Sequence, residues 1–147
     1  MSQKHVRELT GRNDGADVQK YLKAVGLRGN WPWCAAFVVW CIKQVGLLTN
    51  ANGAARSFFT PQTKIWPGVP GAAPPQPGDL VGYRFVRRDI DHIGINKFWG
   101  TGPTADVLEG NTSGKKADRD GQGVYEKWVL KSQIAEVADL FKCARIK

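Results

Sequence analysis

A cluster of prolines divides this chain into two parts. The segment "WPGVPGAAPPQPGD", residues 66–79, holds five of the eight prolines of the sequence. Proline lacks a backbone N–H and fixes its own φ, so such a segment cannot continue a helix or lie inside a sheet. We therefore expect an irregular connector between two differently folded halves.

The half before the connector has helical periodicity. Residues 14–27 place apolar side chains on one helical face: Val18, Tyr21, Leu22 and Val25. This pattern predicts a helix that stops at Gly26. A second apolar face predicts a largely buried helix from residue 34 to 45: Cys34, Phe37, Val38, Cys41, Ile42 and Val45. Pro32 precedes this helix and Gly46 follows it. A third, short helical segment is predicted over residues 54–59.

The half after the connector is rich in strand-forming residues. Four segments are predicted to be strands: residues 79–86, 91–99, 105–110 and 123–130. Each is bounded by Gly, Pro, Asp or Asn. Residues 132–147 fit either a helix or an edge strand. The sequence thus predicts an α+β fold, with N-terminal helices packed on a mostly antiparallel sheet, and a single domain over residues 1–147.

The charge and composition narrow the possible partners. The formal net charge is +8 and the sequence pI is about 9.6, with the basic residues scattered along the chain. This balance fits a polyanionic partner such as nucleic acid, anionic lipid or an acidic polymer of the bacterial envelope, and equally a solvated basic surface. The first 30 residues contain no uninterrupted apolar stretch of signal-peptide length, and no part of the sequence approaches the roughly 18 apolar residues of a membrane span, so we expect synthesis in the cytoplasm.

Neither a disulfide scaffold nor a metal site is expected. The three cysteines form no CxxC pair, and the only histidines are His5 and His92. No cofactor is expected. The segment "GRNDGAD" offers Asn13, Asp14 and Asp17, but it lacks the alternating ligands of a calcium loop. Helix capping is the preferred interpretation of these residues.

Cys34 lies where the second predicted helix begins. There it meets unpaired backbone N–H groups and the positive end of the helix dipole, and both favour a thiolate. Alternatively, Cys34 is a small apolar residue at the start of a buried face. We expect a structural role for Cys41, about 10 Å further along the helix and deep in the core.

A thiolate nucleophile needs a base and a group that orients this base. His92 in "DHIGI" is the candidate base, whereas His5 lies in a polar terminal segment. Glu109 and Asn111 are two residues apart on a predicted strand, so we expect both side chains on one face as candidate orienting groups. Asp91 would point to the opposite face from His92 and is the weaker choice.

The order of these motifs resembles the CHAP domain, a papain-like cysteine, histidine-dependent amidohydrolase/peptidase. The resemblance rests on "PWCAAFVVWC", "PQPGDLVGYR", "DHIGI" and "LEGNT". It implies that Cys34 is the nucleophile, that His92 is the general base and acid, and that Glu109 with Asn111 orients the imidazole. No side chain is evident for an oxyanion hole, so this role is assigned to the Cys34 backbone N–H, with Asn30 or Trp31 nearby.

The resemblance further implies hydrolysis of peptidoglycan amide bonds, as in a phage lysin or a secreted antibacterial effector. The bond is either the one between sugar and first L-alanine or one within the stem peptide and its cross-bridge. The aromatic residues Trp31, Trp33, Phe98 and Trp99 are candidates for lining the substrate groove. Expected partners are peptidoglycan, anionic envelope polymers, and a holin, a phage particle or secretion machinery that delivers the protein to the wall.

Two other functional classes remain open at this point. The same residues could serve a cysteine peptidase or deamidase toxin that acts on a protein. Alternatively, the chain is a basic binding module in which Cys34 and His92 have no catalytic role. Nucleic acid is not an expected partner, because the sequence has no helix-turn-helix or zinc-finger signature.

Overall fold

The computed structural model describes residues 5–114 and 121–146. Its helical elements are α1 (Ala16–Ala24), α2 (Cys34–Gln44), the 3₁₀ segment η1 (Ala55–Phe58), the 3₁₀ segment η2 (Lys131–Gln133) and α3 (Leu140–Cys143). Its strands are β1 (Leu47–Thr49), β2 (Lys64–Trp66), β3 (Leu80–Tyr83), β4 (His92–Phe98), β5 (Thr104–Thr112), β6 (Gly123–Leu130), β7 (Glu136–Ala138) and β8 (Ala144–Ile146).

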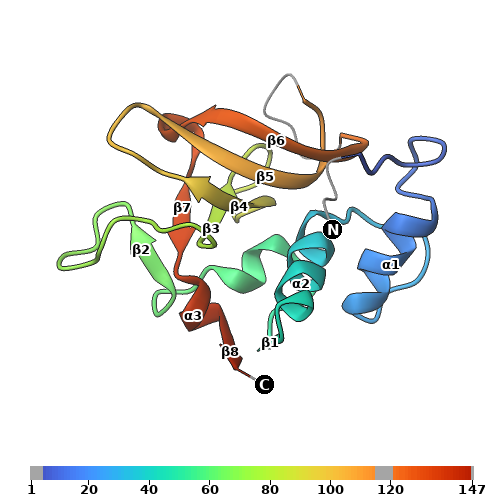
Figure 1. Cartoon of the computed structure of the whole chain (residues 1–147), viewed down its shortest axis with the longest axis horizontal. Helices are drawn as coiled ribbons and strands as arrows, with labels where there is room; N and C mark the ends of the chain where they lie inside the picture. The colour runs from blue at the N-terminus through green and yellow to red at the C-terminus, as the bar shows by residue number, and fades with distance from the viewer. Residues whose placement is uncertain (1–4, 115–120, 147) are drawn as a thin grey trace.

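Within the described residues, six of these strands form one antiparallel sheet in the order β2-β7-β3-β4-β5-β6. Strands β1 and β8 pair separately. The sheet curves over one side of α2, and α1 lies on the other side of that helix (Figure 1). The predicted α+β fold, with N-terminal helices on a mostly antiparallel sheet, is therefore confirmed.

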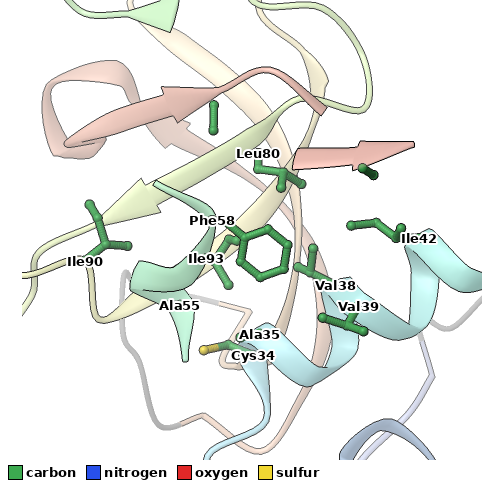
Figure 2. Packing of buried hydrophobic residues seen from close by; sticks show 12 residues of the cluster. Cys34, Ala35, Val38, Val39, Ile42, Ala55, Phe58, Leu80, Ile90 and Ile93 are labelled. Carbon is green, nitrogen blue, oxygen red and sulfur yellow. The ribbon is translucent and has the colours of Figure 1, made fainter. Parts of the chain in front are cut away.

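Helix α2 is buried because it is covered from both sides. Toward the sheet, it contributes to an apolar cluster with Phe58, Leu80 and Ile93 (Figure 2). Toward α1, a second cluster joins it to Tyr21 and Leu22, among others. Helix α2 is therefore buried on two faces, whereas the sequence pattern predicts one. Val45, which the pattern assigns to the buried face, lies beyond the helix end and is exposed.

Several short elements differ from the sequence prediction. Strands β1 and β2 were not predicted, because three residues are too few for a period-2 pattern to stand out. The C-terminal segment, which fits either a helix or an edge strand by sequence, is divided among three short elements: β7 lies inside the sheet between β2 and β3, and α3 and β8 follow it. The proline-rich connector is irregular from residue 67 to 79, as predicted. In the described part of the chain, no helix has the length and apolar character needed to cross a bilayer.

Candidate active site

Cys34 is the first residue of α2. The first backbone bond of this helix runs from the Phe37 N–H to the Trp33 carbonyl, 2.9 Å, so the N–H groups of residues 34–36 precede the regular helical hydrogen bonds. The side chain is 6% exposed. It lines an open pocket of about 130 Å³, together with residues of the β3–β4 loop and of the segment around η1. A thiol at this position has the helix N-terminus beneath it and access to a ligand.

His92 is the first residue of β4, and its ring is fully buried. The ring packs near the rings of Tyr83 and Phe85, with centroid separations of 5.6 and 5.8 Å. Its Nε2 lies 2.7 Å from Oε1 of Glu109. The other nitrogen, Nδ1, is buried and has no well-formed hydrogen bond to any described residue. This nitrogen is the one left for a reacting group.

The electrostatic environment favours the protonated form of His92. Burial by itself lowers the pKa of the ring, but the neighbouring Cys34 thiol and the Glu109 carboxylate together raise it from 6.5 to about 10. Both partners stabilise the imidazolium. The site therefore favours a protonated His92 beside the Cys34 thiol.

Glu109 is held at both of its oxygens. The Tyr83 hydroxyl donates to Oε2 at 2.7 Å, and the Lys127 ammonium lies 3.5 Å from Oε1, the oxygen that also contacts His92. The carboxylate is 1% exposed. Burial raises the pKa of Glu109, but His92, Lys127 and Tyr83 outweigh this effect and lower it. The carboxylate thus stays ionised and fixed against the ring.

A glycine makes the contact between His92 and Glu109 possible. Gly94 is the register partner of Glu109 across β4 and β5, and it lies two residues from His92 on the same face. A Cβ at Gly94 would lie 2.6 Å from Cγ of Glu109 and 2.6 Å from a methyl carbon of Val107. The glycine of "DHIGI" therefore leaves space for the carboxylate to lie across the strand toward His92.

Asn111 does not join this pair, contrary to the expectation that it shares a face with Glu109. The β5–β6 register shifts between Glu109 and Thr112, and Asn111 adopts a positive φ of 56°. This β-bulge interrupts the side-chain alternation on which the expectation rested. The Asn111 Oδ1 accepts a hydrogen bond from the Trp33 N–H at 2.9 Å, and its Nδ2 donates to the Gly121 carbonyl at 2.8 Å. Asn111 thus anchors the start of α2 to the sheet.

The aromatic residues predicted to line the substrate groove do not lie together in the structure. Trp31 is 54% exposed and lies three residues from Cys34, so it remains a candidate substrate contact. Trp33 is fully buried and stacks on Tyr21, so its placement in the groove is corrected to the core. Trp99 follows the far end of β4 and packs on Trp66, about 20 Å of strand away from His92. Phe98, at that same end, contacts Trp128 instead.

Other candidate residues have structural contacts. Asp91 accepts three backbone N–H groups of the β3–β4 loop, from residues 85–87, and so stabilises the turn before His92. His5 is exposed in the N-terminal segment. Cys41 is half-buried rather than deep in the core, and burial raises the pKa of its thiol to about 12.

The acidic residues near α1 do not cap that helix, contrary to the preferred interpretation. Gly15 occupies the N-cap position, and no side chain bonds to the helix there. Asp14 instead accepts hydrogen bonds from the backbone and hydroxyl of Thr10, and Asp17 pairs with Lys20. The described residues contain no group of three or more His, Cys, Asp or Glu side chains arranged to hold a metal ion.

Sequence reasoning missed two members of the site, Tyr83 and Lys127. The period-2 alternation of each strand indicates that both residues face inward. Tyr83 is two residues after the buried Val81, and Lys127 is two residues before the buried Val129. A lysine at an inward position of a strand needs a buried anionic or polar partner, and Glu109 is one such partner.

The site places a cysteine at a helix N-terminus beside a histidine and a carboxylate on an antiparallel sheet, an arrangement that suits a cysteine- and histidine-dependent hydrolase. The family model of the CHAP domain matches residues 26–111, more than half of the chain. The chain therefore belongs to the CHAP family, whose members are generally cysteine- and histidine-dependent amidohydrolases or peptidases. No curated protein and no solved structure matches it.

Proposed function

We propose that this protein hydrolyses amide bonds of peptidoglycan, with Cys34 as the nucleophile and His92 as the general base and acid. The observation that carries this proposal is the buried His92–Glu109 contact of 2.7 Å, with the Cys34 thiol beside the ring and at the wall of an open pocket. A buried imidazolium and carboxylate next to a thiol at a helix N-terminus suit acyl transfer.

The proposed reaction has two steps. In the first, the Cys34 thiolate attacks the amide carbonyl carbon, and the protonated His92 gives its Nδ1 proton to the leaving amine as the C–N bond breaks. In the second, His92 takes a proton from water as that water attacks the thioester; the C–S bond breaks, the carboxylic acid leaves, and the Cys34 thiolate is regenerated beside the protonated His92. We assign the stabilisation of the oxyanion in both steps to the Cys34 N–H at the start of α2.

The charges around the pocket support an anionic substrate. Arg56, Arg87 and Asp91 line the pocket beside Cys34. The Asp91 carboxylate accepts backbone N–H groups of the β3–β4 loop, whereas neither guanidinium forms an ion pair or a side-chain hydrogen bond with a described residue. The stem peptides of peptidoglycan carry carboxylates, which guanidinium groups bind well. We expect Arg56→Gln with Arg87→Gln to raise KM more than it lowers kcat. The matched control is Arg28→Gln, an exposed arginine that does not line this pocket.

The proposal is tested by digesting purified cell walls and identifying the released muropeptides by mass spectrometry. New amino and carboxyl ends show the bond that is cut and separate an amidase from an endopeptidase. Cys34→Ala and His92→Ala should each abolish release to a similar extent, because base and nucleophile act as a unit. Cys41→Ala, which alters a half-buried thiol outside the pocket, should retain activity. Wall digestion that survives in Cys34→Ala would contradict the proposal.

We further propose that the protein acts at the bacterial cell wall and that other components deliver it there, such as a holin, a phage particle or secretion machinery. The basic net charge supports this, since wall polymers are anionic. Deletion of a candidate delivery component that leaves wall damage unchanged would contradict that route.

A further inference from the structure

The side chain of Lys127 is buried in the interior next to the proposed site. It projects from β6 and is 8% exposed. Its ammonium lies 2.6 Å from the Thr112 hydroxyl, 3.2 Å from the Ser113 carbonyl and 3.5 Å from Oε1 of Glu109. A buried ammonium is costly unless charged and polar groups surround it. Glu109 therefore contributes to charge compensation of Lys127, and Lys127 contributes to that of Glu109.

Several titratable groups face Glu109 from the elements packed against it. His92 approaches from β4, the Tyr83 hydroxyl from β3 and Lys127 from β6, while Tyr125 is its register partner on β6. Cys34, from α2, interacts with His92. When the thiol is ionised and the imidazole protonated, the charges of Cys34, His92, Glu109 and Lys127 alternate in sign and sum to zero.

We propose that Lys127 and Tyr83 are positioning residues that act on His92 through Glu109: Lys127 keeps this carboxylate anionic, and the Tyr83 hydroxyl fixes its rotation. The inference rests on the proposed role of His92 as base. Neither residue lines the pocket beside Cys34, so neither is expected to touch the substrate. Lys127 also lies outside the residues that the family model matches.

Removal of the ammonium should make Glu109 accept a proton more readily. An opposite charge at this range changes a carboxyl pKa by about one unit or more. A protonated Glu109 no longer stabilises the imidazolium, so the thiolate and imidazolium pair would form only at higher pH. Lys127→Met should therefore move the acid limb of kcat/KM upward by about one pH unit and lower kcat at the pH values of that limb, without raising KM.

The test compares Lys127→Met with Lys127→Arg and Thr112→Val. Lys127→Arg keeps the charge and should leave the acid limb near that of the wild type. Thr112→Val removes the 2.6 Å hydrogen bond between Lys127 and Thr112 but leaves Glu109 in place, so it should lower the melting temperature without moving the limb. Tyr83→Phe removes only the hydroxyl and should lower kcat with KM unchanged. This last variant keeps the proposal testable if Lys127→Met fails to fold.

A second readout separates this inference from the proposed function. The rate of Cys34 alkylation by iodoacetamide, measured against pH in the same variants, follows thiolate formation without any wall substrate. A shifted alkylation limb in Lys127→Met supports the inference even if the wild type cleaves no peptidoglycan. An acid limb that is unchanged or lower in Lys127→Met, or equally shifted in Lys127→Arg, would overturn the role of Lys127. A Tyr83→Phe variant with wild-type kcat would overturn that of Tyr83.

Discussion

Substitution of Asn111 should reduce stability, whereas substitution of Glu109 should remove activity. In Asn111→Ala, the buried Trp33 N–H and Gly121 carbonyl lose their partners at 2.9 and 2.8 Å. Each loss costs roughly 1–2 kcal/mol in a buried setting. Alanine at a φ of 56° adds about 1 kcal/mol. We therefore expect the free energy of unfolding to fall by about 3–5 kcal/mol.

Two matched variants separate hydrogen-bond loss from backbone strain at Asn111, and the charge of Glu109 from its hydrogen bond. Asn111→Gly loses the same hydrogen bonds but tolerates the positive φ, so it should be more stable than Asn111→Ala by about 1 kcal/mol. Glu109→Gln can still accept a hydrogen bond from His92, but it lacks the charge that stabilises the imidazolium. It should therefore lose most of its activity while its fold stays intact.

The measurements are urea unfolding followed by circular dichroism, and wall digestion well below the unfolding midpoint of each variant. The reasoning predicts a large drop in the midpoint for Asn111→Ala, with more residual activity than in Glu109→Ala. It would be refuted if Asn111→Ala unfolded within 1 kcal/mol of the wild type yet was as inactive as Glu109→Ala. In that case Asn111 would act on the chemistry, and the assignment of its hydrogen bonds to helix anchoring would be wrong.

Three further outcomes are expected. Iodoacetamide at neutral pH should label Cys34 before Cys41, because burial raises the pKa of the Cys41 thiol to about 12. Mass spectrometry of tryptic peptides measures the order of labelling, and preferential labelling of Cys41 would contradict this prediction. Gly94→Ala should reduce activity at least tenfold, because its Cβ would lie 2.6 Å from two side-chain carbons, whereas Gly102→Ala, with nothing within 4 Å, should not. Because the pKa of His92 is raised from 6.5 to about 10, its contribution to the unfolding free energy is complete below pH 6.5 and is lost as the pH rises through about 10. Urea midpoints measured across this pH range should therefore fall more steeply in the wild type than in Cys34→Ala. Parallel plots of midpoint against pH would refute the coupling between Cys34 and His92.

Local patterns in the sequence were sufficient for the elements and for the separate candidates. Pro32 before an apolar run placed the start of a helix at Cys34, and "DHIGI" placed His92 on a strand, because helix starts and strand alternation depend on neighbouring residues. The same motifs together indicated the family, which the match over residues 26–111 confirms. The catalytic roles of Cys34 and His92 stay predictions until the variants are measured.

The tertiary structure decided which side chains meet. The contact between His92 and Glu109 depends on the register of β4 against β5 and on the space at Gly94. A bulge redirects Asn111 to the start of α2, and burial between α1 and α2 removes Trp33 from any groove. Tyr83 and Lys127 reach Glu109 from β3 and β6. Periodicity reports the face of an element on which a residue lies, but not which elements become neighbours or where a bulge shifts the register, since both depend on packing between distant parts of the chain.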